Sequence, residues 1–365
     1  MNYILTAFFI VIGFILYENI RLYLCKKTIP IRIQVNGTRG KSETVRLVHA
    51  ALTAMNYRVL GKTTGTVPYW ILPGGSFKKI NRIAPANIQE QYKLIYKAKK
   101  MKCNAVVAEC MAVNPEFQSA CARIVQPDIT ILTNAYTDHV QEIGENEVQT
   151  LKTLLLSIPQ GSRVVVGDIS PEGKLFLDVQ AVRKDLQLYE KDDSFPVQKN
   201  DFKFNVFEDN IRTALKTVEL LGGDLDASYE GMKEVSPEVG SFKFLKISNS
   251  VILANAFAAN DLLSTEKLFE YSKKIYPDKT MIGLFNPRDD RQDRTLCFES
   301  FLADGRFKKL LSTHRLPSKM GKNIEYTVIK DVRKISELIP QNSLVFGFGN
   351  IRDISAWLMT LEVER

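Results

Sequence analysis

The stretch Ile31-Arg32-Ile33-Gln34-Val35-Asn36-Gly37-Thr38-Arg39-Gly40-Lys41-Ser42 decides how this chain folds. Alternating apolar and polar residues from Ile31 to Val35 predict a short strand, and the apolar residues that follow Ser42 recur at the spacing of one helix face. A strand that passes through a glycine turn into a helix presents unpaired N–H groups and the positive end of the helix dipole. The stretch therefore predicts a cradle for phosphate groups.

Each residue type in this cradle has a chemical reason to be there. Gly37 and Gly40 can adopt backbone angles closed to other residues, and they put no side chain between the backbone N–H groups and a phosphate. Lys41 can reach outer phosphates, and the Ser42 hydroxyl can bind the magnesium ion that accompanies them. The loop is shorter than the common nucleotide-binding loop, because Val35 stands where a glycine is expected six residues before the lysine. A glycine turn that caps a helix beside a surface lysine is the alternative interpretation.

Length and composition indicate a packed globular protein with room for two domains. The chain has 365 residues, of which 45% are hydrophobic and 25% charged, and its net charge is +8. No arginine-rich tract or aromatic RNA-binding motif accompanies this charge, so we expect no nucleic-acid partner; a membrane surface or a polyanionic product would explain it equally well. Five cysteines without metal-site spacing argue against a disulfide framework and favour a reducing cytosol.

The N-terminus carries a membrane signal. Residues Tyr3 to Tyr17 are almost wholly apolar, but a bilayer span of about 20 residues also needs part of Glu18 to Leu24. Positive charges at Arg21, Lys26 and Lys27 follow directly, without a small-residue cleavage site. We therefore expect an uncleaved, single-pass anchor in the cell membrane, with the N-terminus outside and the catalytic part in the cytoplasm.

The pattern after the cradle predicts a doubly wound, mostly parallel α/β sheet. Continuous apolar runs separated by helix-length sequence predict strands buried on both faces, at Ala105 to Ala108, Ile129 to Leu132 and Val164 to Val166. Helices are predicted from Ala86 to Lys102 and from Asp209 to Leu221, and a mobile basic loop is predicted from Pro68 to Pro85. A second unit is expected to begin near Gly240 and to contain these further strands: Phe244 to Ile247, Val251 to Leu253, Met281 to Phe285 and Ser343 to Phe346. One strand is also expected at Phe204 to Phe207, and a helix after Gly349.

Polar residues directly after the predicted strands are candidates for a metal and phosphate site, because ligands of such sheets bind at the carboxyl ends of the strands. Glu109 ends one run, and Asn134 to His139, with the pair Asp138-His139, follows the next. Carboxylates suit magnesium, and a neutral imidazole can join them. Taken singly, Glu109 is also consistent with a helix-capping acid and His139 with a surface histidine.

Two further stretches are open to more than one interpretation. The hydroxyl-rich stretch Gly61 to Thr66 is consistent with a second ligand-binding turn or with an ordinary connecting loop. Residues Arg288 to Arg294 interleave three arginines with three aspartates after a predicted strand. This pattern indicates an anion-binding loop, with a merely charged loop as the alternative.

The combined motifs resemble the Mur ligase superfamily of ATP-dependent amide ligases. The carriers of this resemblance are Asn36 to Ser42, Glu109-Cys110, Asn134 with Asp138-His139, and Asp209-Asn210. Within that superfamily the chain is more similar to the membrane-anchored ligase subunits of poly-γ-glutamate synthases, of the capsule-biosynthesis type. The stretches that carry this closer likeness are Ile33 to Ser42, Gly61 to Thr66, Glu109 to Pro115, Phe257 to Asp261, Arg291 to Thr295 and Gly347 to Asn350.

This resemblance implies the domain organisation and the partners. It implies a membrane anchor at residues 1–27, an ATP-binding central domain at 28–240 and a smaller, Rossmann-like C-terminal ligase domain at 241–365. There is no room for the family's first domain, so we expect no cell-wall nucleotide substrate. The implied cofactors are ATP and Mg²⁺, and the implied partners are glutamate, a γ-glutamyl chain and small membrane subunits of a synthase and export complex.

The resemblance also implies roles for individual residues. Catalytic roles fall to Lys41, Glu109, His139, Arg291 and Arg294. Nucleotide contacts fall to Gly37, Thr38, Arg39, Gly40, Lys41, Ser42, Asn210 and Arg288. Metal ligands would be Ser42, Thr64, Thr66, Glu109 and His139. Many members carry a carbamylated lysine after the Asp-His pair, and Lys152 is the nearest candidate here.

The chemistry expected from these residues is amide formation through an acyl phosphate. Transfer of the γ-phosphoryl group of ATP to a carboxylate creates a leaving group, and the amine of glutamate then displaces phosphate to give a γ-amide. Two alternatives stay open. One is a related ligase that adds glutamate or another amino acid to a different acceptor, and the other is a membrane-tethered nucleotide-driven switch or assembly factor.

Overall fold

The computed structural model describes residues 2–65, 67–82, 87–111, 114–136, 143–191, 193–198, 201–202, 206–235, 240–259, 262–287, 295–320 and 324–364. The chain forms two compact units, Met1–Ser236 and Pro237–Arg365. The boundary expected from the sequence between the central and the C-terminal domain lies four residues later, between residues 240 and 241. Each unit contains its own sheet and its own hydrophobic core, and each is described separately below.

Unit 1 is built on an eight-stranded sheet with the order β4-β3-β2-β5-β1-β6-β7-β8. Its strands are β1 (Ile31–Asn36), β2 (Val59–Thr63), β3 (Tyr69–Ile71), β4 (Phe77–Lys79), β5 (Ala105–Glu109), β6 (Ile129–Asn134), β7 (Arg163–Asp168) and β8 (Gln187–Glu190). From β2 to β8 all neighbours in the sheet run parallel, whereas β3 and β4 add an antiparallel edge. The carboxyl ends of β2, β5, β1 and β6 therefore lie side by side, which is where the sequence places its polar candidates.

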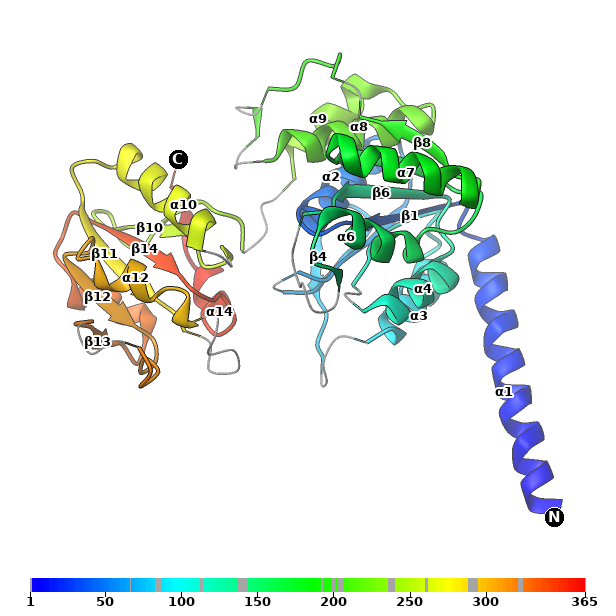
Figure 1. Cartoon of the computed structure of the whole chain (residues 1–365), viewed down its shortest axis with the longest axis horizontal. Coiled ribbons are helices and arrows are strands. Elements are labelled where there is room, and N and C mark those ends of the chain that lie inside the picture. Colours follow the sequence, from blue (N-terminus) through cyan, green and yellow to red (C-terminus); the bar gives the residue numbers. More distant parts are fainter. Residues whose placement is uncertain are drawn as a thin grey trace. The chain divides into compact units, whose positions relative to one another are not determined.

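Helices cover both faces of this sheet (Figure 1). The helical segments of unit 1 are α1 (Asn2–Lys27), α2 (Lys41–Ala54), α3 (Gln89–Lys100), α4 (Pro115–Val125), α6 (Glu147–Leu154), η1 (Leu155–Ser157), α7 (Pro171–Lys184), α8 (Glu208–Leu220) and α9 (Leu225–Lys233). One core cluster joins α2, α8 and α9 to one face of the central strands, and two others join α3, α6 and α7 to the opposite face. Strands buried on both faces explain the continuous apolar runs in the sequence.

Helix α1 leaves unit 1 beside α3 and α4 (Figure 1). In the described part of the chain it is the one helix long and apolar enough to cross a membrane, from Tyr3 to Lys27. Its N-terminal part is exposed, whereas Leu22 and Cys25 near its end are buried in the core of unit 1.

Unit 2 is built on a seven-stranded sheet with the order β13-β12-β11-β14-β10-β9-β15. Its elements are β9 (Phe244–Lys246), β10 (Ile252–Asn255), α10 (Leu262–Ile275), β11 (Thr280–Phe285), α12 (Glu299–Ala303), β12 (Lys309–Ser312), β13 (Thr327–Val328), η3 (Val332–Lys334), α13 (Ile335–Leu338), β14 (Ser343–Phe348), α14 (Ser355–Leu358) and β15 (Glu362–Val363). The five strands β13, β12, β11, β14 and β10 run parallel, and β9 pairs antiparallel with β10 on one side and with β15 on the other. One face packs on phenylalanine rings, among them Phe269, Phe301 and Phe346.

The predicted α/β fold with a parallel sheet is confirmed, and three local predictions were wrong. Part of the predicted loop between Pro68 and Pro85 forms a hairpin, β3 and β4, because Tyr69, Trp70 and Ile71 are buried beside β2. Strand β2 continues to Thr63, so the first half of the hydroxyl-rich stretch is strand, not turn. The helix expected after Gly349 is reduced to the single turn of α14. Most of the strand predicted at Phe204 lies outside the described residues, and Val206 and Phe207 are not in a strand.

Candidate functional site

The predicted phosphate cradle is the turn between β1 and α2. Gly37 has a φ of +132° and Gly40 a φ of +79°, both in the region that favours glycine. Gly40 caps α2, so the first N–H groups of that helix are free of a side-chain cap. At the start of the turn, the Asn36 side chain accepts a 2.8 Å hydrogen bond from the N–H of Gly37. The turn therefore has the backbone geometry that an anion-binding loop requires.

Close packing under the turn is a second reason for the two glycines. A Cβ at Gly37 would lie 2.1 Å from Thr133 Oγ1, and a Cβ at Gly40 would lie 2.7 Å from Asn210 Nδ2. Thr133 is near the end of β6 and Asn210 is in the first turn of α8. Side chains from distant parts of the sequence thus pack closely against the two glycines of the loop.

The end of strand β6 holds the loop in place. Asn134 Oδ1 accepts hydrogen bonds from Thr38 Oγ1 at 2.8 Å and from Arg39 N at 2.9 Å, and Asn134 Nδ2 donates to Arg39 O at 3.1 Å. Thr133 Oγ1 donates to the same carbonyl at 2.7 Å. Asn134 was predicted only as part of the motif Asn134 to His139, and Thr133 was not predicted. Both residues directly follow the apolar run Ile129 to Leu132, and that position is the sequence signal that could have identified them.

Lys41 folds back over the cradle. Its Nζ donates to Gly37 O at 2.6 Å and to Thr38 O at 3.2 Å. These partners are carbonyl groups of the loop itself, so the amine lies at the mouth of the cradle. A bound phosphate would offer this amine a charged partner in place of two neutral ones.

Glu109 joins the cradle to the ends of two other strands. One oxygen, Oε2, accepts from Ser42 Oγ at 2.7 Å and from Thr64 N at 2.7 Å. Glu109 is the last residue of β5, Ser42 begins α2, and Thr64 directly follows β2. The Glu109 side chain is buried, which leaves few partners for it other than these donors.

The donor set at this point suits a hard divalent cation. A carboxylate and a serine hydroxyl are oxygen ligands, which Mg²⁺ prefers. The described residues contain no cluster of three or more His, Cys, Asp or Glu side chains that could hold a metal. Any ion here would therefore depend on Ser42, Glu109, water and phosphate oxygens, together with ligands from outside the described part of the chain.

Asn210 reaches the cradle from α8 and is linked to α2. Its Nδ2 donates to Glu43 Oε1 at 2.8 Å, and the N–H of Phe207 donates to the same oxygen at 3.0 Å. Burial raises the pKa of Glu43, although these two hydrogen bonds oppose the shift. Asn210, which the resemblance names as a nucleotide contact, thus lies beside Gly40, and its role stays a prediction.

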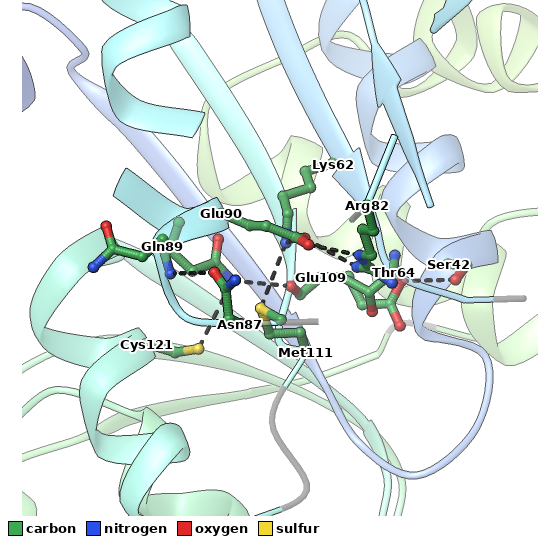
Figure 2. A network of polar contacts seen from close by, with 11 residues as sticks. Ser42, Lys62, Thr64, Arg82, Asn87, Gln89, Glu90, Glu109, Met111 and Cys121 are labelled. Carbon is green, nitrogen blue, oxygen red and sulfur yellow. Dashed lines mark hydrogen bonds and ion pairs between the residues drawn. The ribbon is translucent and has the colours of Figure 1, made fainter. Parts of the chain in front are cut away.

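A buried charge cluster lies behind Glu109 (Figure 2). Lys62, with no exposed surface, lies 3.2 Å from Glu90 Oε2, and Arg82 donates to both Glu90 oxygens at 2.6 and 2.9 Å. Lys62 Nζ also lies 3.8 Å from Met111 Sδ. This cluster was not predicted from the sequence, because Lys62 lies in the stretch Gly61 to Thr66, for which a turn or a loop was expected.

The charges in this cluster depend on one another. Burial lowers the pKa of Lys62, and the carboxylates of Glu90 and Glu109 oppose that shift. Burial alone would raise the pKa of Glu90, but the hydrogen bond from Arg82 and the charge of Lys62 outweigh it and hold the pKa below its ordinary value. Glu90 is therefore ionised at neutral pH and balances the buried amine.

Several predicted site residues have no structural description. Thr66, Asp138, His139, Arg288, Arg291 and Arg294 lie outside the described residues. Lys152 is exposed in the last turn of α6. The structure brings together Gly37 to Ser42, Thr64, Glu109 and Asn210, and the roles assigned to all these residues stay predictions.

Substitution of Gly40 by alanine tests the cradle. We expect Gly40→Ala to weaken binding of a nucleoside triphosphate at least tenfold, because the added Cβ meets the Asn210 amide and the positive φ becomes strained. Binding of a fluorescent ATP analogue measures this effect. Gly74→Ala is the matched control, since Gly74 has a φ of +90° and nothing within 4 Å of an added Cβ. Equal affinity of the Gly40 variant and the wild type would contradict the role of the turn.

A double-mutant cycle tests the buried cluster. We expect Glu90→Gln to destabilise unit 1 by about 3 kcal/mol, because Lys62 is left charged and buried without its carboxylate. Lys62→Met/Glu90→Gln should recover much of that loss, because it removes both charges together. Chemical unfolding of the detergent-solubilised chain, followed by Trp70 fluorescence in a Trp357→Phe background, measures the free energy of unfolding of both variants and of Lys62→Met, the single variant that completes the cycle. Strictly additive losses would show that the two residues do not act as a pair.

Family models and known proteins match both units of the chain. A model described as the Mur ligase middle domain matches residues 35–217, and the poly-gamma-glutamate synthase CapB C-terminal domain matches residues 242–363. The chain is 29% identical over 347 residues to the PGA synthase CapB of Bacillus subtilis (strain 168), covering 88% of each chain. It is 27% identical over 361 residues to the capsule biosynthesis protein CapB of Bacillus anthracis, covering 92% of this chain and 77% of that one.

Solved structures show the same fold. A folylpolyglutamate synthase from Thermotoga maritima superposes with a TM-score of 0.64 at 17% identity, covering 94% of this chain and 93% of that one. A bifunctional folylpolyglutamate synthase/dihydrofolate synthase from Yersinia pestis, complexed with AMPPNP and Mn ion, superposes with a TM-score of 0.67 at 17% identity. The match covers 93% of this chain and 91% of that one. The middle-domain model alone spans half of the chain and includes the cradle, Glu109 and Asn210. The resemblance seen in the sequence is therefore confirmed, and the chain belongs to the Mur ligase family.

Proposed function

We propose that this protein is an ATP-dependent amide ligase that polymerises glutamate through γ-amide bonds and releases ADP and phosphate. The observation that carries the proposal is the contact of Ser42 and Thr64 with Glu109 at the mouth of a glycine cradle, in a chain whose second unit matches the C-terminal domain of a poly-gamma-glutamate synthase. The two curated relatives, named for PGA synthesis and capsule biosynthesis, support the same substrate.

ATP and a divalent cation are the proposed cofactors. Structures of the same fold contain ADP, or AMPPNP with manganese, and the oxygen donors found here fit such an ion. We assign Mg²⁺ to Ser42 and Glu109, with Thr64, Thr66 and His139 as further proposed ligands. When bound, the ion neutralises phosphate charge and orients the triphosphate.

The residues of this chain then position and stabilise the reacting groups. The N–H groups of the cradle and the start of α2 hold the phosphates, and Lys41 exchanges its loop carbonyls for the outer phosphate oxygens. The carboxylate of the donor attacks the γ-phosphorus and ADP leaves, which gives an acyl phosphate. The amine of the incoming glutamate attacks the acyl carbon, and phosphate leaves with the former carboxylate oxygen.

Specificity for glutamyl groups requires fixed cations. Arg288, Arg291 and Arg294 are the proposed partners of the α-carboxylate, because a guanidinium binds a carboxylate through two parallel hydrogen bonds. Helix α1 is proposed to anchor the ligase at the cell membrane with both units in the cytoplasm, where small membrane subunits would receive the polymer.

Glutamate-dependent ADP release tests the proposed activity. We expect the purified full chain with Mg-ATP to release ADP faster when L- or D-glutamate or short γ-glutamyl oligomers are present, and to lengthen the oligomers. Lys41→Ala should reduce this rate by a factor on the order of one hundred, because it removes a charge that stabilises the transferring phosphoryl group. Lys274→Ala, at an exposed lysine of α10, is the control and should leave the rate unchanged.

Two outcomes would contradict the proposal. Turnover that ignores every glutamyl compound, even with partner subunits restored, would favour a nucleotide-driven switch. Turnover with glutamate that leaves γ-glutamyl oligomers unchanged would favour a ligase with a different acceptor.

A further inference from the structure

Helix α1 is built into the core of unit 1 at its C-terminal end. Leu22 and Cys25 are 5% and 3% exposed, and they belong to the same hydrophobic cluster as Leu94 and Ala98 of α3. The Arg21 guanidinium lies 4.3 Å from the centre of the Tyr96 ring, which also belongs to α3. The anchor therefore continues into the domain as a packed element, and α3 is fixed to it.

The exposed apolar surface of α1 reaches the place where α1 packs on unit 1. The uncharged run from Tyr3 to Tyr17 covers about 22 Å at 1.5 Å per residue, whereas the hydrocarbon core of a bilayer is about 30 Å thick. The charged side chains begin at Glu18, but Ile20, Tyr23 and Leu24 extend the exposed apolar surface toward the end of the helix. A bilayer whose hydrocarbon core covers this surface therefore has its headgroups close to the place where α1 packs against α3.

Basic side chains are exposed on each of the three helices that meet here, α1, α3 and α4. The N-terminal part of α1 has no basic residue, but Arg21, Lys26 and Lys27 lie in its last two turns. Lys26 Nζ donates to Arg123 O at 3.3 Å, which brings the end of α4 to the same place. Lys93 and Lys100 are exposed on α3, two turns apart on one face. We call these six residues the basic collar: Arg21, Lys26, Lys27, Lys93, Lys100 and Arg123.

The helices that carry the collar contain few acidic residues that could neutralise its positive charge. Glu18 is the acidic residue of α1, and Glu90 of α3 is buried and paired with Lys62 and Arg82. Glu116 lies in the first turn of α4, at the end opposite Arg123. The exposed charges of these three helices are therefore mostly positive, and Figure 1 shows α3 and α4 beside the end of α1.

We propose that the basic collar binds the headgroups of anionic phospholipids and fixes the orientation of unit 1 on the membrane. This proposal rests on the membrane anchoring given above and adds a second, electrostatic contact to it. Anionic lipids attract basic residues within about one Debye length of the surface, roughly 8 Å at physiological salt. Because α3 is packed on α1, one orientation of the domain satisfies both contacts.

The test measures how close α3 lies to the lipid headgroups. The full chain carries Cys297→Ser, which removes the exposed cysteine, and a fluorophore at Gln89→Cys, an exposed site on α3. The labelled chain is placed in nanodiscs of phosphatidylcholine, or of phosphatidylcholine with 30% phosphatidylglycerol. Both kinds of disc contain the same fraction of a lipid whose headgroup carries a quencher of the fluorophore. We expect at least twofold stronger quenching in the anionic discs at 0.1 M salt, and equal quenching in both discs at 0.5 M salt.

Paired variants separate the collar from general charge. Lys93→Gln/Lys100→Gln should abolish the difference between the two discs, whereas Lys273→Gln/Lys274→Gln, with the same loss of charge on α10, should preserve it. Equal quenching of the parent chain in both kinds of disc at 0.1 M salt would overturn the proposal. Loss of the difference between the discs in both paired variants would overturn it too. A chain that fails to enter either disc would overturn it as well. Glutamate-dependent ADP release in detergent is measured in parallel, so failure of the collar is distinguished from failure of the ligase.

Discussion

One carboxylate oxygen connects the parts of the candidate active site. Glu109 Oε2 accepts from Ser42 Oγ at the start of α2 and from Thr64 N after β2, and Glu109 itself ends β5. Three segments that are far apart in the sequence are thereby held at one edge of the sheet. The arrangement depends on the strand order, because β2, β5 and β1 are neighbours whose carboxyl ends coincide.

The surroundings of Glu109 give the site its rigidity. On one side, Thr133, Asn134 and Asn210 support the glycine turn through contacts that leave no room for a Cβ. On the other side, Lys62 and Glu90 bury a pair of opposite charges directly behind the carboxylate. A cradle supported in this way keeps its N–H groups oriented before phosphate arrives, which is the condition for effective electrostatic catalysis. This rigidity is what a ligase that acts by positioning and charge neutralisation requires.

Much of the fold and part of the site could be predicted from the sequence. The strand-turn-helix pattern around Gly37 and the continuous apolar runs predicted the parallel sheet, because both are local consequences of burial on two faces. Glu109 could be named because it ends a predicted strand, whereas Asn210 was named through the family resemblance. Lys62 could not, because its burial depends on an ion pair with Glu90 of α3, which Arg82 also contacts, and no local pattern encodes such a contact. The hairpin of β3 and β4 was missed for a similar reason: its basic, glycine-containing sequence forms strands only because β2 provides an edge.

The transfer of an oxygen atom tests the ligase mechanism most directly. Glutamate labelled with ¹⁸O in its γ-carboxylate is given to the full chain with Mg-ATP, and the released phosphate is analysed by mass spectrometry. An acyl-phosphate route predicts that each phosphate carries one ¹⁸O atom, because the amine displaces phosphate together with a former carboxylate oxygen. Phosphate without the label, released during the same turnover, would show that ATP is hydrolysed by water and would contradict the account.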